Sequence, residues 1–298
     1  MEKILFTGAS GFLGHNVRPI LDKIYEVHSI GLTDEDDIKI NIAKEVPSIS
    51  THYDVVLHAA GKAHVVPKTK EEKQVFYDVN YQGTVNLCKA LEIACIPKSL
   101  VFISTVAVYG CEFGELITEE HPLKGDSPYA QSKIMAEEYL IKWCEKHGVV
   151  LTILRPSLLA GNNAPGNLGT MVKGIQKGFY FNIAGGKAKK SILMAEDIAH
   201  LLPLIEEKGG IYNVCDSYQP TFGEISTSIA KQLGKHKPIS IPYWMAWCMA
   251  KIGDLLGNKA LINSYKLDKM TKSLTFSNEK ARNELGWEPL DVLTNYKI

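Results

Sequence analysis

The sequence has no net charge, no close-set cysteines and no long apolar run, and each absence narrows the possible functions. Lysine plus arginine equal aspartate plus glutamate at 33 each, so no basic surface for nucleic acid is indicated. The six cysteines are scattered, form no C-x-x-C pair and have no histidine at ligand spacing. We therefore expect neither a disulfide framework nor a metal site, and reduced thiols indicate a cytoplasmic protein.

The hydrophobic segments are too short for a membrane-spanning protein. The chain opens with MEKILFTG, an apolar run that reaches glycine at residue 8, which is too short for a secretory signal. No run approaches the roughly 20 apolar residues that span a bilayer. The richest segment, residues 241–257, is aromatic with charges inside a helical pattern, so we expect a packing helix; a peripheral membrane contact stays open.

Short β-type runs alternate with helical stretches in the first half of the chain. The runs are residues 3–8, 26–31, 54–60, 100–105 and 149–156, and the helical stretches are residues 12–24, 73–95 and 128–147. Continuous apolar strands separated by helices are typical of a parallel sheet covered on both faces. The sequence therefore predicts an α/β fold with a doubly wound parallel sheet over residues 1–160.

Residues 161–298 contain glycine-rich loops and mixed elements, with apolar helices near residues 223–234 and 243–256. We expect a smaller α/β lobe here that binds the substrate. Residues 191–205 and 211–216 have the patterns of a helix and a strand, and we expect parts of 190–216 to return to the first domain.

The first predicted strand leads into T-G-A-S-G-F-L-G, with glycines at positions 8, 11 and 14. A tight turn at Gly8, close approach of a pyrophosphate at Gly11 and helix packing at Gly14 each require a residue without a side chain. This position right after an N-terminal strand predicts a dinucleotide site. Its expected residues are Gly8, Gly11, Phe12, Leu13 and Gly14.

The end of the second strand bears on the choice of dinucleotide. An acidic residue that would bind the adenosine ribose is replaced by Gly31 and Leu32. No arginine stands nearby for a 2′-phosphate, and the acidic run 34-DEDD-37 would repel one if it faced the site. These residues favour NAD and leave NADP open. If the acids form a solvated loop, they carry no information on the cofactor.

Two tyrosine–lysine pairs have the same spacing, 129-YAQSK-133 and 265-YKLDK-269. Positions i and i+4 share one face of a helix, so either pair can point into a cleft. A free tyrosine titrates near pH ~10, and a lysine ammonium together with an oxidised nicotinamide would lower that pKa toward neutrality. Spacing alone does not choose between the pairs.

The combination of motifs resembles the extended short-chain dehydrogenases/reductases. The glycine motif, 54-DVVLHAAG-61, 80-NYQGTVNL-87, 102-FISTVAVYG-110 and YAQSK follow the order of that family, and 280-KARNELGWEP-289 resembles its closing L-G-W-x-P element. The resemblance spans nearly the whole chain and implies a Rossmann-type first domain. It is strongest to the nucleotide-sugar epimerases and 4-ketoreductases of surface-polysaccharide synthesis.

The resemblance also implies roles for individual residues. Tyr129 and Lys133 match the catalytic pair, and only this pair follows a strand ending in Ser104 and Thr105, the position of the family's catalytic hydroxyl. The implied cofactor residues, besides this pair and the glycine motif, are Asn41, Ile42, His58, Ala59, Ala60 and Asn80. The implied substrate residues are Thr105, Asn167, Leu168 and Lys190, with Lys266 and Lys269 as further candidates for binding a diphosphate.

The expected reaction is hydride transfer at C4 of a nucleotide-activated sugar, as a 4-epimerase of a UDP-sugar. Val106 and Ala107 follow Thr105 where the family's 4,6-dehydratases have Asp-Glu, which argues against a dehydratase. An NAD(P)H-dependent 4-ketoreductase of a 4-keto-6-deoxy sugar stays open. A non-catalytic redox sensor is disfavoured by the tyrosine–lysine pair, and a steroid or flavonoid reductase by Lys190 and Asn167–Leu168. A homodimer is also open.

Overall fold

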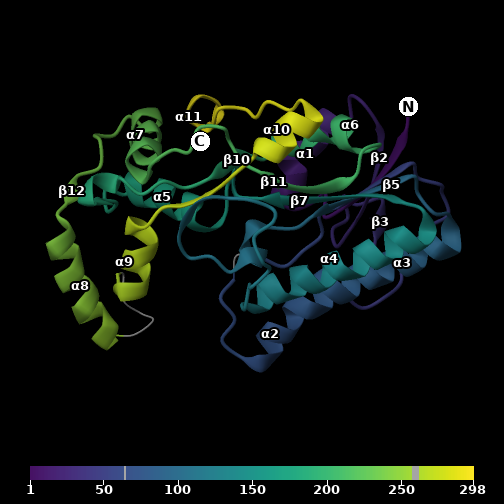
Figure 1. Cartoon of the computed structure of the whole chain (residues 1–298), viewed down its shortest axis with the longest axis horizontal. Helices are drawn as coiled ribbons and strands as arrows, with labels where there is room; N and C mark the ends of the chain where they lie inside the picture. The colour runs from purple at the N-terminus through teal and green to yellow at the C-terminus, as the bar shows by residue number, and fades with distance from the viewer. Residues whose placement is uncertain (64, 257–261) are drawn as a thin grey trace.

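A parallel sheet of seven strands forms the centre of the molecule (Figure 1), and this confirms the predicted α/β fold. The computed structural model describes residues 1–63, 65–256 and 262–298. The strand order is β11-β7-β5-β4-β1-β2-β3. The strands are β1 (Lys3–Thr7), β2 (Glu26–Gly31), β3 (Ile38–Lys39), β4 (Val55–His58), β5 (Ser99–Ile103), β7 (Val150–Pro156) and β11 (Gly210–Val214).

The strand order reverses beside β1, which pairs with β2 on one side and β4 on the other. The chain leaves β1 for β2 and β3, then crosses back to β4 and continues outward through β5 and β7. At such a reversal, the loops after neighbouring strands diverge and leave a crevice at their carboxyl ends. The glycine motif follows β1 at this point.

Helices cover both faces of the sheet (Figure 1). One face carries α1 (Phe12–Leu21), α6 (Asp197–Ile205) and α10 (Glu279–Leu285), and the other carries α3 (Gly83–Ala94) and α4 (Pro128–His147). Alternate residues of β1 supply the two cores, with Ile4 and Phe6 in one and Leu5 in the other. Burial on both faces explains why the strands are continuous apolar runs.

The helix predicted over residues 73–95 is interrupted. The structure has α2 (Lys70–Tyr77), a π-helical turn at Asp78–Gln82, and then α3. The turn contains Asn80, whose fully buried side chain bonds to the loop after β4 and to α4. Local π-turns are frequent at functional sites because they redirect one side chain without ending the helix.

The prediction of one helix over residues 191–205 is wrong in its first part. Residues 192–194 form strand β10 (Ile192–Met194), which pairs with β8 (Leu158–Ala160), and α6 begins only at Asp197. A short, fully buried apolar run has no periodicity that distinguishes strand from helix. After α6, β11 pairs with β7 at the edge of the main sheet.

The remaining elements form a smaller lobe at one end of the molecule (Figure 1). They include α5 (Gly166–Gln176), α7 (Phe222–Gln232), α8 (Tyr243–Leu256), α9 (Ser264–Thr271) and α11 (Val292–Asn295). Two short parallel pairs accompany them: β9 (Asn182–Ile183) with β12 (Ser240–Ile241), and β6 (Gly114–Ile117) with β13 (Leu274–Phe276). The helix expected near residues 223–234 is α7. It begins at a capping box in which the side chains of Thr221 and Glu224 each bond to the backbone N–H of the other residue.

Candidate active site

The glycine turn lies at the carboxyl end of β1, and two of its three glycines have no room for a side chain. Gly8 has φ +80°, and a Cβ there would lie 2.8 Å from the Ala60 nitrogen. A Cβ on Gly14 would lie 1.9 Å from the Ala9 carbonyl oxygen, so α1 packs against the turn itself. Gly11 is the exposed N-cap of α1, and no side chain of the described residues caps that helix end. The backbone N–H groups at the N-terminus of α1 are therefore suited to bind an anion.

Phe12 and Leu13, at the start of α1, are half-buried. Phe12 packs against the core of the small lobe, whereas Leu13 packs against the core of the main sheet. Their side chains therefore fix the helix between the two cores. Any contact of these residues with a pyrophosphate would come from their backbone.

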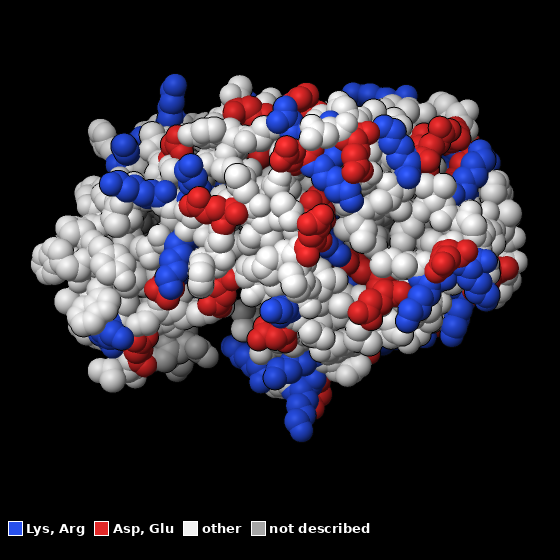
Figure 2. Space-filling model, in the orientation of Figure 1, with Lys and Arg blue, Asp and Glu red and all other residues white. Residues whose placement is uncertain are grey.

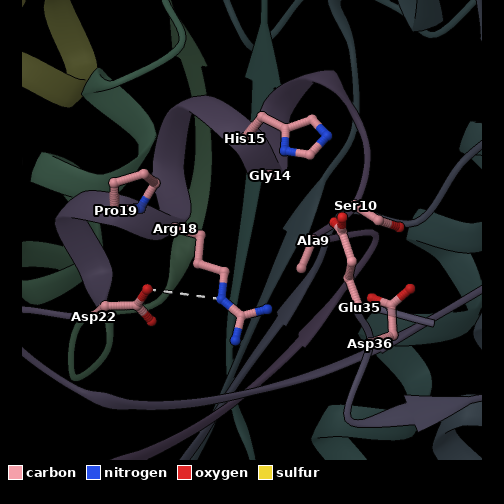
Figure 3. Close-up of a pocket in the computed structure, with 9 residues that line it drawn as sticks. All are labelled: Ala9, Ser10, Gly14, His15, Arg18, Pro19, Asp22, Glu35 and Asp36. Carbon is pink, nitrogen blue, oxygen red and sulfur yellow. Dashed lines mark ion pairs between the residues drawn. The ribbon is translucent and has the colours of Figure 1, made fainter. Parts of the chain in front are cut away.

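A cavity of about 200 Å³ lies beside the glycine turn (Figure 3). It is lined by Ala9, Ser10, Gly14, His15, Arg18, Pro19, Asp22, Glu35 and Asp36. Figure 3 shows the Arg18 guanidinium extending from α1 toward the turn that carries Glu35 and Asp36. The cavity thus adjoins the end of β2 and the acidic turn that follows it.

Arg18 is a residue of this region that the sequence interpretation missed. Its Nε lies 3.7 Å from Asp22 Oδ2, and its Nη2 lies 3.8 Å from Asp37 Oδ2. Partial burial opposes ionisation of Asp37, but bonds from the Ser29 backbone and hydroxyl, with the charge of Arg18, lower the pKa of its carboxyl. The available signal was helical spacing: Arg18 lies one turn after Gly14, on the same side of α1.

The acidic run 34-DEDD-37 is not uniformly a solvated loop. Asp34 and Glu35 are exposed, whereas Asp36 is buried and its Oδ2 accepts bonds from the Thr33 N–H and hydroxyl. A Cβ on Gly31 would lie 2.3 Å from Asp36 Oδ2. Glycine at the end of β2 is therefore explained by the inward turn of Asp36.

Tyr129 and Lys133 lie in the first two turns of α4. Ser127 caps the helix, its hydroxyl accepting from the Ala130 N–H at 3.1 Å, and Pro128 takes the first helical position. Tyr129 lies next to Thr105, whose side chain favours the ionised phenol. Lys133 Nζ donates to the Ile103 carbonyl oxygen at 2.7 Å. The structure thus brings Thr105, Tyr129 and Lys133 together at the carboxyl end of β5.

Burial controls the protonation of both members of this pair. Desolvation raises the pKa of Tyr129, and the neighbouring Thr105 side chain opposes the rise only in part. Desolvation lowers the pKa of Lys133 to about 8, although the negative charge of Glu137 opposes this change. In the protein alone, burial therefore outweighs the interactions that favour the phenolate. The expected lowering of the Tyr129 pKa includes the charge of an oxidised nicotinamide and stays a prediction.

Ser104, predicted as a catalytic hydroxyl, belongs to a buried network behind the site. It is 2% exposed, and its hydroxyl bonds to Glu137 Oε1. Glu137 Oε2 accepts from Arg155 Nη2 at 2.6 Å, and Arg155 Nη1 donates to the Tyr109 hydroxyl at 3.0 Å. Because neighbouring residues at a strand end point to opposite sides, Thr105 faces Tyr129 and Ser104 faces away. The catalytic prediction for Ser104 is wrong for that reason.

His58, predicted to line the cofactor, is fully buried with both ring nitrogens bonded. Nδ1 is 2.6 Å from Thr7 Oγ1, and Nε2 is 2.8 Å from Thr84 Oγ1. The Thr84 hydroxyl donates to the Asn80 carbonyl, so it accepts from Nε2 of a neutral ring. Burial and the charge of Lys133 lower the pKa of His58 to about 3. The side chain therefore tethers β1, β4 and α3 and does not reach a ligand, which corrects its predicted role.

Asn80 joins the loop after β4 to α4. Its Oδ1 accepts from the Lys62 N–H at 2.7 Å, and its Nδ2 donates to Ser132 Oγ at 2.9 Å. A Cβ on Gly61 in this loop would lie 3.3 Å from Lys133 Nζ. Asn80 is fully buried, so it supports the site as the resemblance implied and makes no direct ligand contact.

The other predicted cofactor residues lie on neighbouring loops. Ala59 and Ala60 are half-buried after β4, with the Ala60 N–H donating to Thr7 Oγ1 at 3.1 Å. Asn41 is half-buried, and its side chain accepts from the Ala43 N–H. Ile42 lies in the core below α3, where its carbonyl accepts from Asn86. Asn41 thus holds a local turn, and the Ile42 side chain is a core residue.

In the small lobe, the predicted substrate residues have different surroundings. Asn167 is exposed in the first turn of α5, whereas Leu168 is 2% exposed and packs in the lobe's core. The Leu168 side chain is thus a core residue, and its predicted contact with the substrate stays a prediction. Lys190 Nζ donates to the Lys272 carbonyl at 3.1 Å. Burial and the nearby charge of Lys269 lower the pKa of Lys190 to about 8, so these two lysines form one positive cluster.

The chain belongs to the NAD dependent epimerase/dehydratase family. Residues 4–215 match the model of this family, which is more than half of the chain. The match covers the glycine turn, Thr105, Tyr129 and Lys133. The predicted family is confirmed, and NAD, the expected cofactor, is the one that the family's description names.

Curated relatives extend over almost the full chain. A UDP-glucose 4-epimerase of Vibrio cholerae is 26% identical over 320 residues, with 98% of this chain and 92% of the relative covered. An N-acetyl-α-D-glucosaminyl-diphospho-ditrans,octacis-undecaprenol 4-epimerase of Escherichia coli O157:H7 is 27% identical over 303 residues, with 95% and 89% covered. This chain is therefore similar to epimerases that act on two kinds of sugar diphosphate.

A solved structure supports the fold along the whole length. The UDP-glucose 4-epimerase of Thermotoga maritima, determined with UDP-glucose, has a TM-score of 0.74 at 20% identity. The superposition covers 99% of this chain and 96% of that one. At this identity, the likeness concerns the fold.

Proposed function

We propose that this protein is an NAD-dependent 4-epimerase that inverts C4 of a nucleotide-activated sugar. The observation that carries the proposal is the meeting of Thr105, Tyr129 and Lys133 at the carboxyl end of β5, beside the glycine turn after β1. The family match and the epimerases among the relatives support it.

The glycine turn fits a dinucleotide. Gly8 requires a positive φ, a Cβ on it would fill the space before Ala60, and the uncapped end of α1 presents N–H groups where a pyrophosphate would bind. Lys133, close to Gly61, is placed to bond the ribose next to the nicotinamide. When bound, the dinucleotide would supply the hydride acceptor and donor for C4.

Tyr129 is proposed to remove the proton from the C4 hydroxyl and to return it to the same oxygen when hydride is added to the opposite face of C4. The Thr105 hydroxyl, next to Tyr129, would orient the C4 oxygen. The ammonium of Lys133 favours the negative charge that develops on the phenol oxygen, and burial of both residues strengthens this effect because little water screens it. Asn80 and His58 would hold the surrounding loops in place.

The nature of the group beyond the diphosphate is a separate question. Lys190 and Lys269 lie together in the small lobe and suit the two phosphates of a sugar diphosphate. Our first candidate for the group attached to the far side of the diphosphate is a nucleoside. A polyprenol is the second candidate, favoured by the exposed apolar side chains of α8. This helix packs against α9 and therefore lies near Lys269.

The test is incubation of the purified protein with UDP-glucose, UDP-N-acetylglucosamine and their diphospho-undecaprenol counterparts, followed by chromatographic separation of the C4 epimers. Conversion of a substrate to its C4 epimer without added reduced dinucleotide, together with detection of co-purified NAD by mass spectrometry, supports the epimerase. Turnover of a 4-keto sugar only with stoichiometric NAD(P)H would instead establish the 4-ketoreductase. Binding of dinucleotide with neither activity would establish the sensor.

Cytoplasmic residence and a homodimer remain part of the proposal. The observation available is that no helix of the described residues is long and apolar enough to span a bilayer. Sedimentation velocity would establish the oligomeric state.

A further inference from the structure

Helix α8 has its small residues inside and its large apolar residues outside. Ala246, Ala250 and Gly253 are buried against the lobe, where the two alanines meet Ile183 and Leu267. The opposite side carries Trp244 (67% exposed), Ile252 (61%) and Leu255 (89%). A surface helix of a soluble domain normally shows the reverse arrangement. We call the exposed side the outer face of α8, formed by Trp244, Met245, Trp247, Met249, Ile252 and Leu255.

The outer face is a continuous patch at one end of the molecule. Figure 1 shows α8 at the extremity of the small lobe, away from the main sheet. In Figure 2 this end shows a broad white surface with one basic and one acidic side chain below it, whereas acidic and basic side chains are interspersed over the sheet lobe. Isolated exposed apolar residues are ordinary on protein surfaces, but a contiguous patch marks a site of interaction.

The charge around the patch indicates what binds there. Residues 231–272 contain eight lysines and two aspartates, with no arginine or glutamate, although the chain as a whole is neutral. Lys251, on α8 itself, has its Nζ 5.6 Å from the centre of the Trp247 ring and 3.9 Å from Asp254 Oδ2, and 53% of its side chain is exposed. Aromatic rings with lysines beside them are typical of helices that lie in the interface of a bilayer, with the ammonium groups among anionic headgroups.

We propose that the outer face of α8 docks this protein on the surface of an anionic lipid bilayer. Trp244, Trp247 and Leu255 enter the boundary between headgroups and acyl chains, and the surrounding lysines bind the headgroups. Two copies joined through the same face would bring two lysine-rich segments together, which disfavours a dimer contact. The docking uses neither the glycine turn, nor Tyr129, nor Lys269 of the cluster proposed for the diphosphate, so it is tested separately from the proposed epimerase activity.

The tryptophans make the test direct. The chain has four, and Trp143 and Trp287 are buried at 5% and 2% exposure in the main lobe, so a change in fluorescence on adding vesicles reports on Trp244 and Trp247. The full-length protein is mixed with vesicles of phosphatidylethanolamine and phosphatidylglycerol, or of phosphatidylcholine alone. Flotation gives the bound fraction. We expect binding to the anionic vesicles with a blue shift, quenching by brominated lipid, and weakening by salt.

The decisive variant is Trp244→Gln with Trp247→Gln. Both side chains are exposed, so the thermal unfolding midpoint should not change, while vesicle affinity should fall roughly tenfold or more. Ile93→Gln, which removes an equally exposed apolar side chain from α3, is the control and should bind as the wild type does. Equal binding by the double variant, or no binding by the wild type, would refute the proposal. A dimer that the double variant dissociates, without vesicle binding, would assign the face to a second copy.

Discussion

The chain contains two tyrosine–lysine pairs with the same spacing on two helices, and their surroundings are opposite. Lys133 is 4% exposed and donates to the Ile103 carbonyl, and Tyr129 lies next to Thr105. Tyr265 is 55% exposed, and Lys269 lies over the ring of that same tyrosine. The comparison teaches that the spacing supplies only a common face, and that burial next to a third functional group is what gives a pair its chemistry.

The largest difference between the pairs should be in turnover. Tyr129→Phe removes the hydroxyl proposed to move the C4 proton, and we expect kcat to fall by about 10²–10⁴-fold with little change in thermal stability. Tyr265→Phe is the matched control and should keep kcat within about twofold, because its ring is exposed and far from Thr105 in the fold. Rates are measured with whichever sugar diphosphate turns over. Retention of most of the turnover by Tyr129→Phe would contradict the assignment.

The next difference should lie in how much the residue four positions after each lysine contributes to the free energy of unfolding. Glu137 follows Lys133 by one turn and pairs with the buried Arg155, whereas Ser273 occupies the same offset from Lys269. Glu137→Gln leaves the Arg155 charge uncompensated, and we expect the free energy of unfolding to fall by about 3–5 kcal/mol. Glu138→Gln, at the exposed neighbouring position, should stay within about 0.5 kcal/mol. Equal urea midpoints for the two variants would show that the Glu137–Arg155 ion pair contributes nothing to stability.

The smallest expected difference is a pH dependence carried by Lys133. Its pKa is about 8 in the folded protein and 10.5 for a free lysine. Between these values the unfolded chain binds more protons, so the wild type gains stability as pH rises from 8 to 10.5, by up to about 3 kcal/mol. Lys133→Met lacks this titrating group and does not show the gain. As pH falls from 10.5 to 8, the wild type should therefore lose stability relative to the variant.

Lys269→Met, measured over the same pH series, is the control. Its side chain is exposed, and we expect a change in stability of no more than about 0.5 kcal/mol. If the difference between Lys133→Met and wild type were the same at every pH, the burial of the Lys133 ammonium would not act on stability as proposed.

Much of the main sheet could be predicted because its signals are local. The five strand runs and the helices over residues 12–24 and 128–147 correspond to β1, β2, β4, β5, β7, α1 and α4, since apolar periodicity and the glycine turn act within a few residues. The π-turn at Asn80 could not be predicted, because it depends on bonds to Lys62 and Ser132, far away in the chain. β10 was missed because a short buried run has no distinctive period.

The position of the candidate site could be predicted from the sequence, but the side chains that face it could be predicted only in part. Thr105 and Ser104 are adjacent hydroxyls, and only the orientation of the chain after β5 turns one toward Tyr129 and the other toward Glu137. His58 matched the family's pattern, yet its ring is enclosed by Thr7 and Thr84. Arg18 could not be predicted from the residues after β2, because it reaches that region from α1.

The sequence alone determined the strands of the main sheet in the first half of the chain, the glycine turn and the lysine-rich character of residues 231–272, since these depend on neighbouring residues. The tertiary structure decided which tyrosine–lysine pair is buried, which pKa values shift and which side of α8 faces outward. Those properties depend on desolvation and on contacts between segments far apart in the chain. Two pairs with one spacing therefore became a candidate catalytic pair and an exposed pair only through folding.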